Sequence, residues 1–228
     1  MSFADYYRAF GTYTDMKSEE YRRRLEAIEP LLVRHMRAKG KVLDLGCGIG
    51  GFSFLLEDLG FEVTGIDISE EMLNTAQKLA EKRGSKVEFL LGDARNLPFR
   101  DNSFDYVIFI DGLFHFNPLE LNRVFYEVAR VLKPGGRFLL QFTDMRSLLR
   151  ELKGTQIIGK RYWISEVQPD EKEKTVLIKF SSEDDSFWVR FNVWGKTAVE
   201  LLTKLYFRQL HSENISKHSY FQVYTPKK

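Results

Sequence analysis

The sequence predicts an α/β fold with a doubly wound, mainly parallel sheet. Buried apolar runs alternate with amphipathic segments between residues 40 and 142, which is typical of parallel strands joined by helices. A glycine-rich turn follows the first of these runs. After Thr143 the pattern changes to short alternating strands, which indicates a small inserted antiparallel β-sheet. Together these features predict a Rossmann-like sheet with one insertion.

The parallel part of the chain divides into five predicted strands. They are residues 42–45, 61–67, 87–91, 104–110 and 137–142. The helices between them have recognisable ends, since Ser69 and Asn117 are N-caps of two helices and Gly84 ends the helix that Ser69 begins. The last of these helices is expected to reach Leu132, where a Pro-Gly-Gly sequence stops it.

An amphipathic helix precedes the first strand. Its apolar residues recur every three or four positions, and Pro30 interrupts it or starts a second segment. Arg22, Arg23 and Arg24 form the only compact basic run, and glutamates surround them. We interpret this run as a solvated helix face.

The remaining chain carries the insertion and the end of the fold. In order, a helix is predicted at 144–153, strands at 160–167, 174–180 and 186–194, a helix at 197–205, and strands at 207–215 and 219–225. The insertion leaves after the fifth strand, at the carboxyl ends of the parallel strands where ligands bind. It can therefore fold over a ligand as a lid.

Composition excludes several classes of protein. With 43% hydrophobic and 29% charged residues, the 228-residue chain is globular and long enough for one domain with an elaborated cap. The net charge of +2 gives no basic surface for nucleic acid, and no apolar run is long enough to span a membrane. The single cysteine, Cys47, and the absence of a signal peptide indicate a cytoplasmic protein. We expect either a monomer or a homodimer.

The glycine turn predicts a ligand site. Gly46, Gly48 and Gly50 permit positive φ and close approach of a ligand, and the turn exposes helix N–H groups. Gly46, Gly48 and Gly51 also satisfy the pattern G-x-G-x-x-G, so the glycines alone fit NAD as well. Asp44 at the mouth of the turn distinguishes the two, because a carboxylate repels a pyrophosphate but attracts an ammonium and a sulfonium. These charges favour S-adenosylmethionine.

Further candidate residues end the second and fourth strands. Asp67 follows the glycines by roughly twenty residues, where a carboxylate can accept both ribose hydroxyls of a nucleoside. Ser69 is available as the helix cap, which leaves Asp67 for the ribose. Ile110 ends the fourth strand, and Asp111 and His115 follow at the edge of the predicted site.

Four segments in order resemble one enzyme family. They are VLDLGCGIG at 42–50, GIDIS at 65–69, GDARNLPF at 92–99 and VLKPGG at 131–136. With them the chain resembles the class I S-adenosylmethionine-dependent methyltransferases, most closely the ubiquinone/menaquinone-biosynthesis type. The resemblance covers roughly residues 40 to 142.

The resemblance implies several roles. Asp93 accepts the exocyclic amine of adenine, although a turn cap is the alternative for this residue, and the Ala94 N–H reaches a ring nitrogen. Ile68 packs on one face of the adenine, and Ile110 lies beside the methionine portion. The last two strands close the sheet as an antiparallel C-terminal hairpin, which makes it seven-stranded.

Methyl transfer from a sulfonium needs alignment more than acid–base chemistry. It is an in-line displacement with an excellent leaving group, so a base is required only if the acceptor must lose a proton. His115 is the candidate base because its unperturbed pKa lies near working pH, and Asp111 lies beside it. A partly buried structural ring is the alternative for His115. No histidine or cysteine spacing predicts a metal site.

The acceptor is predicted to bind under a lid of two parts. Trp188, Arg190 and Trp194 share one face of the strand 186–194 and form one wall. Tyr7 and Tyr13 in the aromatic N-terminal segment form the second. Simple packing of the inserted sheet is an equal alternative for the two tryptophans.

The sequence therefore predicts a methyltransferase acting on a small hydrophobic or aromatic molecule. We expect one domain over residues 1–228, with an N-terminal helical cap (1–39), a cofactor-binding core (40–142), an inserted helix and β-sheet lid (143–195), and a closing helix and strands (196–228). The alternatives are an NAD-dependent oxidoreductase and a non-catalytic binding protein with a methyltransferase fold.

Overall fold

A computed structural model gives the fold. It describes residue 16, residues 19–144, residue 147 and residues 156–158, 162–183 and 186–227. Tyr7 and Tyr13 lie outside the described residues, as does most of the helix predicted at 144–153. In the described part of the chain, no helix combines the length and the apolar character needed to cross a bilayer.

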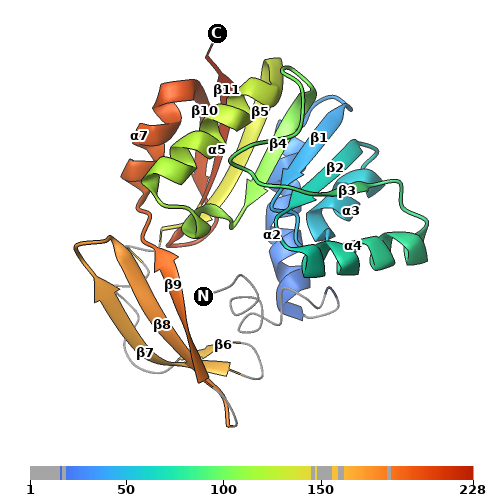
Figure 1. The fold of residues 1–228 in the computed structure, drawn as a ribbon. Helices are drawn as coiled ribbons and strands as arrows, with labels where there is room; N and C mark the ends of the chain where they lie inside the picture. Colours follow the sequence, from blue (N-terminus) through green and yellow to red (C-terminus); the bar gives the residue numbers. More distant parts are fainter. Residues whose placement is uncertain are drawn as a thin grey trace.

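The main sheet has seven strands in the order β10-β11-β5-β4-β1-β2-β3. Their bounds are Lys41–Leu45 (β1), Glu62–Asp67 (β2), Glu88–Leu91 (β3), Phe104–Ile110 (β4), Leu132–Thr143 (β5), Phe207–Asn214 (β10) and Ser219–Pro226 (β11). Strands β1 to β5 pair in parallel, and β11 pairs antiparallel with both β5 and β10. The structure confirms the predicted seven-stranded sheet and its C-terminal antiparallel hairpin (Figure 1).

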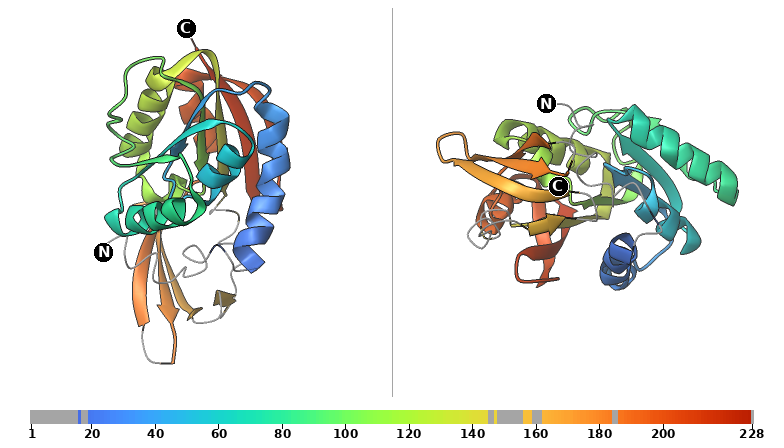
Figure 2. Two further views of the ribbon diagram at one scale, coloured as in Figure 1. Left: turned by 90° about the vertical axis from the view of Figure 1, so that its right-hand side faces the viewer. Right: turned by 90° about the horizontal axis from the view of Figure 1, so that it is seen from below.

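Helices cover both faces of this sheet (Figure 2). Helices α2 (Glu19–His35), α3 (Gly51–Asp58) and α4 (Glu70–Arg83) pack on one face, and α5 (Pro118–Val131) and α7 (Lys196–Tyr206) pack on the other. Side chains alternate accordingly along β1, because Val42 packs in the first cluster and Leu43 in the second. Both residues are fully buried, which explains why the sequence of this strand is an apolar run.

The end of α5 differs from the prediction. The helix ends at Val131, and Leu132 is already extended and pairs with Phe104 of β4. The reason is local, since a residue before proline avoids the α region and Lys133 precedes Pro134. The Pro-Gly-Gly segment therefore lies inside an irregular strand instead of separating a helix from a strand.

The insertion forms a second, antiparallel sheet in the order β6-β7-β8-β9. Its strands are Gln156–Ile158 (β6), Tyr162–Asp170 (β7), Thr175–Ser181 (β8) and Ser186–Asn192 (β9). The three predicted strands are present, and β6 is an addition that the sequence pattern missed. Figure 1 shows this sheet beneath the main sheet, at the end where the chain leaves β4.

Candidate functional site

The glycine turn between β1 and α3 forms one wall of a cavity at the carboxyl ends of the parallel strands. Gly50 has a φ of 86°, and a Cβ there would lie 2.6 Å from the Phe89 ring, so only glycine fits. Gly48 also has positive φ, at 55°, but no atom lies within 4 Å of the point that a Cβ would occupy. The Cα of Gly48 therefore faces open space in the cavity, where a ligand can approach the backbone.

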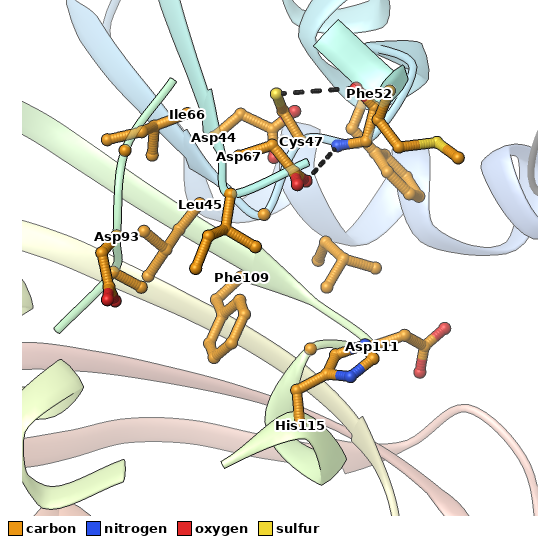
Figure 3. A pocket seen from close by; sticks show the side chains of 18 of the residues that line it. Asp44, Leu45, Cys47, Phe52, Ile66, Asp67, Asp93, Phe109, Asp111 and His115 are labelled. Carbon is orange, nitrogen blue, oxygen red and sulfur yellow. Dashed lines mark hydrogen bonds between the residues drawn. The ribbon is translucent and has the colours of Figure 1, made fainter. Parts of the chain in front are cut away.

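Asp67 closes the turn from the end of β2. Its carboxylate accepts a hydrogen bond from the backbone N–H of Gly48 at 2.8 Å (Figure 3) and another from the backbone N–H of Ser69 at 2.9 Å. Ser69 is also the N-cap of α4, as predicted, because its hydroxyl accepts a bond from the Met72 N–H. Asp67 is 4% exposed, and burial raises its pKa. The structure thus holds a buried carboxylate against the turn.

Asp44 is a second buried carboxyl beside Asp67. It is 3% exposed, and the Ser53 hydroxyl donates a hydrogen bond to it at 2.6 Å. Burial raises the pKa of Asp44 to about 7, the Ser53 hydrogen bond and Arg24 oppose this effect, and the charge of Asp67 adds to it. A cationic ligand group would favour the ionised carboxyl and stabilise it there.

The predicted adenine side is built around Asp93. Arg95 donates to Asp93 from Nε and Nη2, at 2.9 and 2.7 Å, and this pairing lowers the pKa of Asp93. Arg95 Nη1 also contacts Glu120 at 2.5 Å, at the start of α5. Ile68 is 43% exposed and lines the cavity, as do Ala94 and Asp93.

Asp111 and His115 occupy the opposite side of the cavity (Figure 3). Asp111 has a φ of 54°, in the left-handed region, and its carboxylate lies 2.8 Å from Nη2 of Arg24. His115 ends a short 3-10 helix, η2 (Leu113–His115). Burial lowers the pKa of His115 to about 3, so the ring is neutral at physiological pH and a weaker base than the sequence predicts. Ile110 lines the cavity just before Asp111.

The inserted sheet holds this turn in place. Asn192 of β9 donates to the Phe114 carbonyl at 3.1 Å, and the Trp194 indole donates to the Phe116 carbonyl at 3.0 Å. The rings of Phe114 and Phe191 pack with centroids 5.5 Å apart. Two hydrogen bonds and an aromatic contact therefore connect the insertion to the segment that carries His115.

The acceptor residues predicted on the strand 186–194 do not lie at the cavity. Among the described residues that line it, Trp188, Arg190 and Trp194 do not appear. Trp188 is half-buried with Lys179 Nζ 5.9 Å from its ring, and Arg190 is exposed. Trp194 is 6% exposed and packs in the core under α5 and α7. Its position therefore favours the alternative in which this tryptophan packs the insertion onto the main domain.

The sequence interpretation missed two cavity residues from α2, Tyr21 and Arg24. The interpretation of the arginine run as a solvated face holds for Arg22 and Arg23, which are exposed, and is wrong for Arg24, whose side chain is 20% exposed. Helical spacing contained the signal, because Arg24 lies three residues after Tyr21 and four before Ile28, both buried.

The arrangement fits a nucleoside with a charged tail. Asp67 is a buried carboxylate, Ile66, Ile68 and Phe109 supply apolar walls, and the acidic side chains of the cavity suit a positive charge. Within the described ranges, no group of three or more histidine, cysteine, aspartate or glutamate side chains could hold a metal ion.

Comparisons with known proteins agree with this reading. A family model described as a methyltransferase domain matches residues 42–136. The chain is 46% identical over 101 residues to a sterol 24-C-methyltransferase of Gibberella zeae, ERG6B, and 40% identical over 106 residues to a demethylmenaquinone methyltransferase of Thermus thermophilus. These matches cover 43% and 46% of this chain and only 26% and 47% of the two relatives, so the chain spans less than half the length of either.

A crystal structure matches the chain over nearly its whole length. The PH0226 protein from Pyrococcus horikoshii OT3 is 61% identical, covers 98% of this chain and 99% of its own, and superposes with a TM-score of 0.91. The likeness therefore includes the inserted sheet, which the family model over residues 42–136 leaves out.

Proposed function

Because the chain belongs to the class I S-adenosylmethionine-dependent methyltransferases, we propose that it methylates a small hydrophobic or aromatic molecule by in-line displacement. One observation carries the choice of acceptor: the apolar face of the inserted sheet is joined directly to the turn that bears His115. This face contains Ile164, Val176, Ile178, Phe180, Val189 and Phe191, and Phe114 of η2 packs against it. An apolar acceptor held next to this turn would lie beside the cofactor cavity, because His115 lines that cavity.

The residues of the glycine turn and the strand ends would hold the cofactor. Asp67 would accept the ribose hydroxyls, Asp93 and Ala94 would contact the adenine, and Asp44 would favour the positive charges of the methionine portion. S-adenosylmethionine supplies the activated methyl group and a neutral thioether leaving group. The protein then has to position the acceptor and exclude water.

His115 is suited to a site that faces a cation. Its low pKa keeps the ring neutral at physiological pH, so no second positive charge opposes the sulfonium. A neutral imidazole has one nitrogen that accepts a hydrogen bond, which can orient an acceptor hydroxyl or amine. We propose that His115 positions the acceptor and removes a proton only from a group that becomes acidic during transfer. Asp111, paired with Arg24, would support this turn.

The test is a labelling screen. The protein is incubated with methyl-labelled S-adenosylmethionine and a metabolite extract, which is then separated into organic and aqueous phases. We expect label in small molecules of the organic phase. The variant His115→Asn should bind the cofactor as wild type does and lose most of the turnover. Label found only in protein or nucleic acid would contradict the proposed acceptor class.

The single cysteine and the modest net charge of +2 support two lesser proposals. These are a cytoplasmic location and an acceptor other than nucleic acid. A binding titration also separates the alternatives for the ligand, since an oxidoreductase would bind NAD and a methyltransferase would bind S-adenosylmethionine.

A further inference from the structure

The cofactor cavity contains more acidic than basic side chains. Among the described residues that line it, the acidic ones are Asp44, Asp67, Asp93, Asp111 and Glu120, and the basic ones are Arg24 and Arg95. S-adenosylmethionine carries two positive charges and one carboxylate. The acidic groups suit the positive charges, but the carboxylate would be repelled by them unless a guanidinium lies close to it.

Arg95 is committed to the adenine side. It binds both oxygens of Asp93 from Nε, at 3.0 and 2.9 Å, and its Nη1 contacts Glu120. Asp93 follows β3, at the outer edge of the parallel strands, whereas Asp111 follows β4 on the other side of β1 and β2. Figure 3 shows Asp93 and Asp111 on opposite sides of the cavity. Arg95 is therefore far from the methionine portion.

Arg24 lies on the methionine side. Its Nη2 is 2.8 Å from the Asp111 carboxylate, and its guanidinium is 5.4 Å from the centroid of the Phe52 ring. It is also close enough to Asp44 to oppose the rise in that carboxyl's pKa. Resting on the proposed function, we infer that Arg24 binds the carboxylate of S-adenosylmethionine and so determines which sulfonium nucleosides the site accepts.

A guanidinium can perform this role without releasing Asp111. It has five N–H donors in a planar fork, enough for two carboxylates, and it binds a carboxylate with two parallel hydrogen bonds. The bound cofactor then connects α2 to the Asp111 turn that leads to His115. Cofactor binding would in this way also order the side of the cavity where the acceptor lies.

The test compares two cofactors in isothermal titration calorimetry. S-adenosylmethionine and its decarboxylated form share the adenosine, the sulfonium and the amine, and differ in the carboxylate. We expect Arg24→Met to weaken the affinity for S-adenosylmethionine by about ten- to a hundredfold and to change that for the decarboxylated form by less than about twofold. Arg23→Met is the matched control, since Arg23 is exposed and pairs with Glu19 on the outer face of α2.

The outcomes separate this inference from the proposed function. If wild type binds neither compound, the cofactor assignment fails. If wild type binds both compounds and Arg24→Met weakens the two affinities equally, or changes neither affinity, then Arg24 does not contact the carboxylate. If Arg24→Met does not fold, as judged by circular dichroism, Arg24→Lys takes its place. That variant keeps the charge but loses the fork, so its loss should be smaller and again confined to S-adenosylmethionine.

Discussion

Replacing Asp44 with asparagine is expected to stabilise the cofactor-free protein at pH 8. The side chain is 3% exposed, and burial raises its pKa from 3.8 to about 7. Between these values the unfolded chain releases a proton that the folded protein keeps, so wild-type stability falls as pH rises from about 4 to 7. The full difference corresponds to about 4 kcal/mol at pH 8. An amide does not titrate, and its oxygen can still accept the Ser53 hydrogen bond.

Urea unfolding at pH 5 and pH 8 measures this effect. The stability of Asp44→Asn relative to wild type should increase by about 2–3 kcal/mol between the two values, because the folded wild type ionises mainly above pH 5. Asp58→Asn is the control, since its carboxylate is 63% exposed and pairs with Arg83 at the surface. If the difference in stability between Asp44→Asn and wild type is the same at both pH values, Asp44 is not a buried carboxyl that titrates near neutral pH.

Three further predictions concern the site. Ionised Asp44 should favour the cationic cofactor. The wild-type affinity in calorimetry should therefore increase by up to about tenfold for each unit by which the pH is raised toward 7, and the affinity of Asp44→Asn should not change with pH. Asp67→Ala should weaken cofactor binding by about 1.5–3 kcal/mol, and Gly48→Val should do so by filling the open space at the turn; unchanged affinity in both would mean that the site is misassigned. Trp194→Phe should lower the free energy of unfolding by about 1–3 kcal/mol, since the Phe116 carbonyl loses its donor, and should leave the KM of the acceptor unchanged; a raised KM at equal stability would indicate direct contact with the acceptor.

The parallel half of the fold was predictable because burial on both faces leaves a clear pattern. Strand β4, Phe104–Ile110, has the predicted bounds, and six of its seven residues are buried. The glycine turn and Asp67 were predictable for a similar reason, since a sharp backbone turn and a carboxylate at a strand end are local features. Here the residues that form the site are also the residues that form the motif.

Short or irregular elements were not predictable in this way. Strand β6 has three residues, Gln156–Ile158, which is too few to show an alternating pattern. The start of β5 is hidden because Leu132 is apolar and continues the spacing of α5, so the change from helix to strand does not alter the hydrophobic pattern. The pKa of His115 was also outside the reach of the sequence, because it depends on burial by residues distant in the chain.

Trp194 and Arg24 show why side chains around the cavity were harder to assign than the motif itself. The neighbours of each residue in sequence predict its role, and they are an aromatic strand for Trp194 and a cluster of glutamates for Arg24. Their actual partners are distant in sequence, the Phe116 carbonyl for Trp194 and the Asp111 carboxylate for Arg24, and both partners lie in the segment that follows β4. That segment therefore receives contacts from both the insertion and α2. Both α2 and the insertion lie outside residues 42–136, which the family model matches. The elements that contact this side of the cavity can therefore differ while the glycine-turn motif stays the same.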